Sequence, residues 1–81
     1  MILTVELKPG KSATESEVEI YCDSAGLDKL ISSLQRLKAS KEQVDHCHLN
    51  TPSWGGNELT EVAQGKGNIL FKSLTIAVRR K

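Results

Sequence analysis

Only one long segment of the chain, residues 24–38, has apolar side chains at the spacing of a helix. Its apolar positions would form a single stripe on one face, and they are Leu27, Leu30, Ile31, Leu34 and Leu37. Asp23 or Ser24 provides an N-cap, and basic residues near the end of the segment suit the helix dipole. Because one helix can bury only one stripe, the rest of the chain has to supply a sheet for it to cover.

Two segments before this helix alternate between apolar and polar residues with a period of two, which is typical of strands. Residues 3–8 and 17–22 have this pattern, and Pro9-Gly10 with a short polar segment between them predicts an antiparallel hairpin. In the second strand we expect one apolar face to point inward: Val18, Ile20 and Cys22. The outer face has the other three side chains: Glu17, Glu19 and Tyr21.

The second half of the chain is less regular. Residues 44–49 predict a short strand that turns its cysteine and leucine to the helix and its two histidines to the other face. Residues 50–67 contain Gly and Pro and few apolar residues, so we expect a long loop, with one helical turn at residues 59–64. Alternation returns in residues 69–78, which predict the last strand.

The expected order of elements is therefore strand, strand, helix, strand, strand. This order predicts an α+β fold, a two-layer sandwich in which one helix covers one face of a four-stranded, mainly antiparallel sheet. A right-handed crossover through the helix favours the strand order 2-1-3-4. A chain of 81 residues has the size of one small domain, so we expect residues 1–81 to form a single domain.

Composition argues against several classes of protein. Eleven Lys and Arg against ten Asp and Glu give a formal net charge of +1, whereas nucleic-acid-binding domains have a strong basic excess. No apolar run approaches the roughly 18 residues of a membrane span, and the first residues lack the pattern of a signal peptide. So small a core leaves little room for a large cofactor, and the common catalytic motifs are missing. We expect no nucleic-acid or membrane partner, no cofactor and no catalytic residues.

The two cysteines and the charge pattern add two expectations. Cys22 and Cys47 form no dense disulfide framework, so we expect buried thiols in a cytoplasmic protein. The charges fall into blocks, because residues 1–28 sum to −4 (two basic, six acidic) and residues 29–41 to +4. Residues 42–61 sum to −4 and the remainder to +5. Such segregation favours charged surface patches and a protein partner.

His46 and His48 are two residues apart on a predicted strand, so both imidazoles lie on one face. Pairs of this kind occur in metal sites, but zinc needs three or four ligands, and Glu58 is the nearest candidate for a third. The other interpretation is a polar outer face of the sheet, or a histidine that holds the following loop by hydrogen bonds. We expect no metal site here.

The loop at residues 51–59 contains the only tryptophan of the chain, Trp54, beside two glycines that can adopt positive φ. Trp54 could fold over the uncovered face of the sheet and shield Tyr21 and the two histidines. It could equally anchor a partner, since tryptophan is enriched among interface hot spots. The acidic residues near these elements form either a solvated face or a patch complementary to a basic surface.

Two blocks of sequence resemble a known pattern. They are Cys-Asp-Ser-Ala-Gly-Leu-Asp-Lys-Leu at residues 22–30 and His-Cys-His-Leu-Asn-Thr-Pro-Ser-Trp-Gly-Gly-Asn-Glu-Leu-Thr at residues 46–60. They resemble the immunity protein 32 family of bacterial polymorphic toxin systems, with Asn50 and Thr60 in place of Met and Ser. The resemblance implies a protein that neutralises a cognate toxin by binding it. It assigns no catalytic residue, and it leaves the roles of the shared histidines, Trp54 and Glu58 open.

The sequence thus predicts a cytoplasmic, non-enzymatic immunity-type protein that binds a cognate toxin, as a monomer or weak homodimer. Trp54 would anchor the contact, and acidic side chains would oppose a basic cleft of the toxin: Glu17, Glu19, Asp45 and Glu58. Two alternatives stay open. One is a small metal-binding or regulatory domain that uses His46 and His48, and the other is an orphan structural domain that dimerises through a strand edge.

Overall fold

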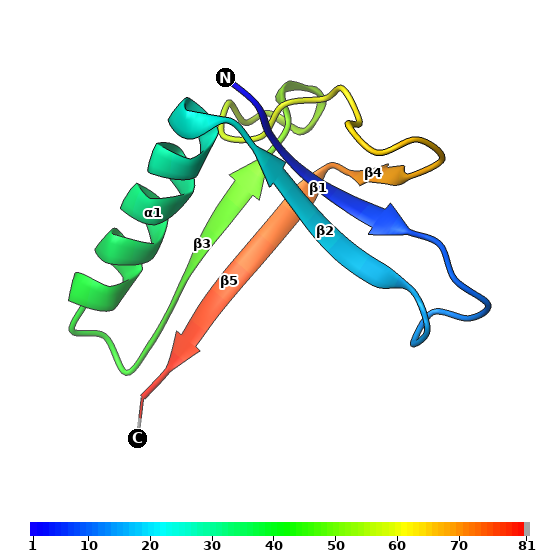
Figure 1. The fold of residues 1–81 in the computed structure, drawn as a ribbon. Coiled ribbons are helices and arrows are strands. Elements are labelled where there is room, and N and C mark those ends of the chain that lie inside the picture. The colour runs from blue at the N-terminus through cyan, green and yellow to red at the C-terminus, as the bar shows by residue number, and fades with distance from the viewer. Residues whose placement is uncertain (81) are drawn as a thin grey trace.

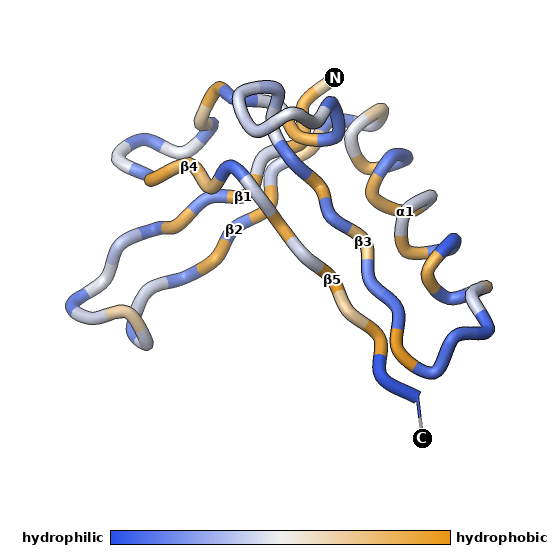
Figure 2. Tube along the Cα trace, turned by 180° about the vertical axis from the view of Figure 1, so that it is seen from behind, coloured by the Kyte–Doolittle hydropathy of each residue, from blue (hydrophilic) through white to orange (hydrophobic). Residues whose placement is uncertain are grey.

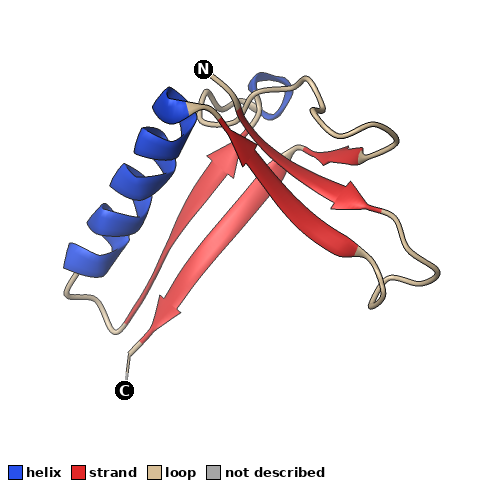
Figure 3. Ribbon diagram, viewed as in Figure 1, coloured by secondary structure: helices blue, strands red, loops and turns tan. Residues whose placement is uncertain are grey.

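The computed structural model describes residues 1–80 and confirms the expected α+β class. Figures 1 and 3 show one long helix and two small groups of strands. No helix within these residues combines the length and the apolar character needed to cross a membrane. In chain order the elements are β1 (Leu3–Lys8), β2 (Glu17–Cys22), α1 (Ser24–Ala39), β3 (Val44–Asn50), the 3-10 helix η1 (Pro52–Trp54), β4 (Ile69–Phe71) and β5 (Ser73–Arg79).

The strands form two sheets, so the predicted single sheet with the order 2-1-3-4 is wrong. β1 lies between β2 and β4 in a three-stranded antiparallel sheet, and β3 pairs with β5 in a two-stranded antiparallel sheet. The reason is a break in the predicted last strand. The carbonyl of Lys72, between β4 and β5, accepts a hydrogen bond from the backbone N–H of Thr51 (3.0 Å). The chain leaves one sheet at this point and enters the other.

The helix matches its prediction, and both of its ends are capped. The Asp23 carboxylate accepts a hydrogen bond from the backbone N–H of Gly26 (2.8 Å). At the other end the Arg80 guanidinium donates to the carbonyl oxygens of Leu37 (3.0 Å) and Lys38 (3.3 Å), where a cation suits the helix dipole. Arg80 therefore fixes the end of the helix. Lys81 lies outside the described residues.

The core is a small aliphatic cluster at the junction of the two sheets. Its fully buried members come from β1, β3 and the long loop, and Leu30 and Leu74 pack against them: Leu3, Val5, Leu49 and Leu59. Leu59 belongs to the predicted helical turn at residues 59–64, which does not form; the segment is irregular and inserts this leucine into the core. Cys47 is buried as expected, but Cys22 is exposed, contrary to the prediction.

The two faces of β2 are exposed in the reverse of the predicted way. Val18 is 64% exposed and Ile20 45%, whereas Glu19 and Tyr21 on the supposed outer face are half-buried. The cause is a segment that covers the polar face of the sheet: the backbone N–H groups of Gln64 and Gly65 both donate to Glu6 of β1. Hydrogen bonding to one carboxylate therefore decides, as much as hydropathy does, which face of this sheet is covered.

Glu6 is fully buried. Burial alone would raise the pKa of its carboxyl. Hydrogen bonds from the Thr4 hydroxyl, from the backbone N–H groups of Gln64 and Gly65 and from the Asn68 amide outweigh that effect and lower the pKa to about 2. The Glu6 carboxylate therefore stays ionised and holds residues 64–68 against β1.

Candidate functional site

The sequence block at residues 46–60 forms the end of β3 and a tight loop. Within the loop, the backbone N–H of Trp54 donates to the carbonyl of Thr51 (2.9 Å), and that of Gly55 donates to the carbonyl of Pro52 (3.0 Å). Gly56 also donates to Thr51 (3.0 Å). Gly55 has a φ of 81°, a conformation that glycine adopts without the steric cost of a side chain. This turn closes directly after Trp54 and fixes the backbone at that residue.

A second set of hydrogen bonds ties the loop to its surroundings. The Glu58 carboxylate accepts from the backbone N–H of Asn50 (3.0 Å), which lowers the pKa of its carboxyl. The carbonyl of Asn50 accepts from Leu59 (3.1 Å), and Glu61 accepts from the backbone N–H of Ser53 (2.7 Å). A Cβ on Gly56 would lie 2.6 Å from the carbonyl oxygen of Asn50, so only glycine fits there. Glu58 thus has a structural partner inside the loop.

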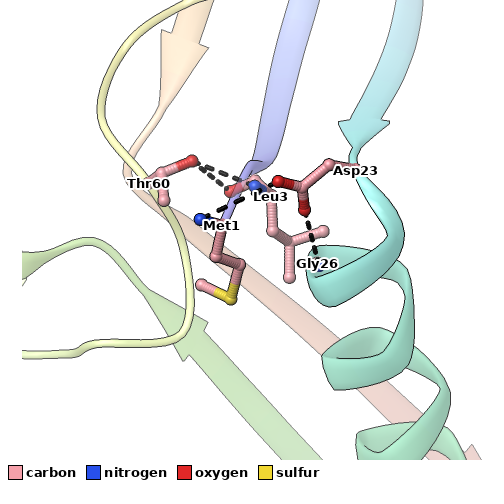
Figure 4. A network of polar contacts seen from close by, with 5 residues as sticks. All are labelled: Met1, Leu3, Asp23, Gly26 and Thr60. Carbon is pink, nitrogen blue, oxygen red and sulfur yellow. Dashed lines mark hydrogen bonds and ion pairs between the residues drawn. The ribbon is translucent and has the colours of Figure 1, made fainter.

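The loop is also joined to β1 and, through β1, to the start of the helix (Figure 4). Thr60 makes three hydrogen bonds with Leu3. Its hydroxyl accepts from the Leu3 backbone N–H (3.0 Å), and both its hydroxyl (3.1 Å) and its own backbone N–H (2.8 Å) donate to the Leu3 carbonyl. Asp23 caps the helix beside them and lies 3.8 Å from the amino group of Met1. Through these contacts β1 holds the end of the loop, and the start of α1 in turn holds the beginning of the chain beside β1.

Trp54 is 62% exposed although the loop around it is tightly bonded. His46 and His48 are exposed as well, so the tryptophan does not shield them as a lid would. A large aromatic side chain held in water on a fixed backbone is unusual, because its burial elsewhere would be favourable. Among the residues of this loop, Trp54 is the large apolar side chain that the fold itself does not use.

His46 and His48 project from the same face of β3, as the sequence predicts. Their ring centroids are 4.6 Å apart at an interplanar angle of 68°, and Nδ1 of His48 lies 2.8 Å from the hydroxyl oxygen of Thr75 on β5. Within residues 1–80, no set of three or more His, Cys, Asp or Glu side chains is grouped closely enough to hold a metal ion. Glu58, the predicted third ligand, instead accepts from the backbone of Asn50.

The other acidic candidates are distributed over two sheets. Glu17 on β2 is exposed, whereas Glu19 is half-buried and accepts hydrogen bonds from the Tyr21 hydroxyl (2.9 Å) and the Asn68 amide (3.0 Å). Asp45 lies on the face of β3 opposite to that of the histidines. The Ser40 hydroxyl and the backbone N–H of His46 donate to Asp45, which lowers the pKa of its carboxyl. Glu17 is therefore the predicted acid with the most accessible carboxylate.

Sequence reasoning missed Glu6, the best-connected carboxylate of the described residues. Alternation placed it on an outer face, and a lone glutamate in a strand gives no sign that it will be buried. The turn residues Gly65, Gly67 and Asn68 were a weak signal, since such a cluster often folds back on a strand. Their target could not be identified without the tertiary structure.

Comparison with known proteins gives one match. A family model described as Imm32, immunity protein 32, matches residues 17–69, from the start of β2 to the first residue of β4. No curated protein and no solved structure matches the chain. The matched region contains both sequence blocks, at residues 22–30 and 46–60, and therefore includes the cap of α1 and the whole Trp54 loop.

Proposed function

The chain belongs to the immunity protein 32 family, and on that premise we propose that it binds a cognate bacterial toxin in the cytoplasm and blocks it without catalysing a reaction. The observation that carries the proposal is Trp54, an exposed aromatic side chain at the tip of a loop whose backbone is fixed by hydrogen bonds. A partner that covers Trp54 would gain its apolar burial at little cost in loop entropy.

The surroundings of Trp54 define what such a partner would meet. His46 and His48 present two exposed imidazoles on β3, the strand that leads into the loop. Glu17 offers an exposed carboxylate farther away, at the end of β2 that pairs with Lys8, and would act on a charged partner at longer range. We propose that the acidic side chains steer a basic toxin surface, with Glu17 contributing most and Glu19, Asp45 and Glu58 less, because the latter three accept hydrogen bonds from their own chain.

The test uses the toxin encoded beside this gene. An equimolar amount of the protein should abolish the activity of the purified toxin. Trp54→Ala should weaken binding by at least about tenfold, with unchanged circular dichroism, because the exposed ring does not support the fold. Val62→Ala is the matched control, since Val62 is 73% exposed and lies outside the Trp54 loop; its binding should equal that of the wild type.

Two results would contradict the proposal at different levels. A toxin that keeps its full activity in the equimolar mixture removes the neutralising function itself. Neutralisation by a Trp54→Ala variant with less than a tenfold loss of affinity removes only the anchor. Glu17→Lys tests the steering, because reversing one exposed charge should slow association and leave dissociation nearly unchanged. An unchanged association rate at low salt would exclude Glu17 from the interface.

A further inference from the structure

The chain has more surface than a compact monomer of its mass. Its accessible surface is 5688 Å², whereas a folded monomer of 8.9 kDa is expected to expose roughly 4,800 Å². Its radius of gyration is 13.7 Å, against about 11.7 Å for 81 residues in a compact domain. The excess of roughly 900 Å² is close to the ~800 Å² that each partner buries in a standard protein interface.

The excess surface includes an apolar groove between the two sheets. Side chains from β1, β2, β4 and β5 line this concavity of about 200 Å³: Val5, Val18, Phe71, Ser73 and Leu74. The sheet register shows why it is apolar, because Val5 is paired with Ile20 on one side and with Phe71 on the other, so these side chains share one face. Figure 2 shows the hydrophobic residues of β1, β2 and β5 in this region.

A second apolar strip lies on the exposed flank of α1: Leu27, Ile31 and Leu34. The opposite flank is charged. There Lys29 lies near enough to Glu58, and Arg36 to Asp45, to lower the pKa of each carboxyl. Figure 1 shows α1 and the β1–β2 hairpin as two arms that diverge from one end of the fold. The apolar flank of the helix, turned away from Lys29 and Arg36, is a second exposed apolar surface of the chain.

We propose that a second copy of this chain packs against β2 at the rim of the apolar groove, in a twofold homodimer formed by antiparallel pairing of β2 with its symmetry mate. β2 is the edge of its sheet, with β1 as its one partner strand among the described residues, so its outer hydrogen-bonding groups are free to pair. A twofold axis through Ile20 sets Ile20 against Ile20 of the other copy and Val18 against Cys22. These are the exposed apolar residues of the strand.

The charges at the centre of β2 agree with this register, and two carboxylates, Glu17 and Asp23, meet only beyond the apolar pairs at its ends. The same axis places the carboxylate of Glu19 opposite Tyr21 of the other copy, whereas an axis through Glu19 would set two carboxylates against each other. Pairing about Ile20 joins the two three-stranded sheets into one sheet with both apolar faces on the same side, so that Val18 and Ile20 of each copy pack against apolar side chains of the other. An interface built from such a face has the apolar character of homodimer interfaces.

The dimer leaves Trp54 and the two histidines of the proposed toxin surface open, whereas Glu17 lies on the paired strand β2. His46 and His48 point to the face of β3 opposite to the buried Cys47 and Leu49. Self-association, measured on the chain without toxin, can therefore be separated from toxin binding at Trp54. The dimer proposal does not rest on the toxin proposal, and failure of one would leave the other standing.

Sedimentation equilibrium of the purified chain, without toxin, tests the proposal. At about 100 μM the wild type should have twice the mass of the 8.9 kDa chain. Val18→Lys should raise the dissociation constant of the dimer at least about tenfold, because it places a charge in the interface. Val62→Lys is the matched control and should remain dimeric, since Val62 is at least as exposed as Val18 but lies outside the groove. Leu34→Glu repeats the test on the helix flank.

A cysteine variant tests the register. In Val18→Cys, the introduced thiol should lie opposite Cys22 of the other copy, within the Cα separation that a disulfide tolerates. Oxidised glutathione, which accepts the two electrons and two protons, should then give a covalent dimer. Within one chain, the introduced thiol and that of Cys22 are about 13 Å apart along the strand and cannot bond to each other. The wild type, which has Cys22 without its partner thiol, should stay non-covalent.

Three outcomes would overturn the proposal. A wild type that stays monomeric at about 100 μM excludes the dimer. A Val18→Lys variant that dimerises as well as the wild type, with native circular dichroism, places the interface elsewhere; if that variant unfolds, the Leu34→Glu result decides. A monomeric wild type whose toxin binding is lost on Val18→Lys would make the groove a docking site for the toxin instead of for a second copy.

Discussion

The two faces of the three-stranded sheet are covered in the reverse of the usual manner. The polar face, which contains Glu6, is covered by the segment at residues 64–68, whereas Val18 and Ile20 on the apolar face are open to solvent. On one face, specific hydrogen bonds to a carboxylate determine the structure. On the other, the single chain leaves apolar side chains without a cover. Burial in this sheet therefore follows polar bonding as much as hydropathy.

The largest effect should come from removing the centre of the polar face. Glu6→Ala should lower the free energy of unfolding by about 3–5 kcal/mol, because two backbone N–H groups and the Asn68 amide lose a shared buried acceptor. Urea denaturation followed by circular dichroism measures it. Glu17→Ala, in the exposed part of β2, is the control and should cost less than about 0.5 kcal/mol.

A variant that does not fold would still leave this prediction testable. Glu6→Gln keeps the shape of the side chain but turns an amide group toward backbone donors, so it should destabilise the fold by less than Glu6→Ala and by more than Glu17→Ala. Equal stability of Glu6→Ala and the wild type would mean that residues 64–68 do not depend on this carboxylate.

Acid should weaken the polar face and spare the apolar one. The pKa of Glu6 is lowered in the folded chain from 4.5 to about 2, so its contribution to stability is fully present above pH 4.5. That contribution is lost as the pH falls from about 4.5 toward about 2, because the unfolded chain binds the proton first. Unfolding midpoints in urea between pH 7 and pH 2.5 measure the loss.

Glu6→Gln isolates this contribution from those of the other carboxylates. Asp23, Asp45, Glu58 and Glu61 also have lowered pKa values in the folded chain, so the wild type loses stability in acid for several reasons. The difference between wild type and Glu6→Gln should shrink across the window from pH 4.5 to pH 2.5. A difference that stays constant would contradict the assignment to Glu6.

Local pattern was sufficient to predict the helix, the hairpin and the facing of β3. Each depends on spacing within one segment: the stripe of α1 with its Asp23 cap, the alternation of β1 and β2, and the opposite faces of His46 and Cys47. The pairing of strands depends on contacts between distant segments. Nothing in the run from Ile69 to Val78 indicated that it would break at Lys72, because both halves have strand-forming residues.

The site shows the same limit. The sequence identified Trp54 and the two histidines as candidates but left open whether Trp54 would shield the histidines, and the structure places all three at the surface. It did not predict that Glu58 would bond to Asn50, or that Asp45 would accept a hydrogen bond from the backbone of His46. Hydrogen-bond partners of a carboxylate are set by the tertiary structure, and residue type alone does not distinguish a loop-building glutamate from a partner-binding one.

The centre of the apolar face is buried, and truncating a side chain there should have an intermediate effect on the free energy of unfolding. Val5 is 3% exposed and belongs to the core cluster. Val5→Ala should lower the free energy of unfolding by about 2 kcal/mol, through lost burial and the small cavity it leaves. Urea midpoints measure it, with Val62→Ala as the exposed control. A loss no larger than that of the control would mean that the centre of this face is not packed.

The smallest effect should come from the rim of the apolar face, and its size should depend on protein concentration. Ile20 is 45% exposed, and Thr has a β-propensity close to that of Ile, so Ile20→Thr should change the stability of the dilute chain by less than about 0.5 kcal/mol. At high concentration the proposed dimer buries this residue against its symmetry mate. The same substitution should then lower the melting temperature relative to the wild type, because only a self-associating chain gains stability with concentration.

Val5→Ala provides the contrast, since its cost arises within one chain and should be the same at both concentrations. Melting curves recorded across a hundredfold range of concentration, about 2 to 200 μM, separate the two cases. If the Ile20→Thr effect does not vary across that range, the open rim is a property of the free monomer, and the two faces of the sheet differ in composition alone.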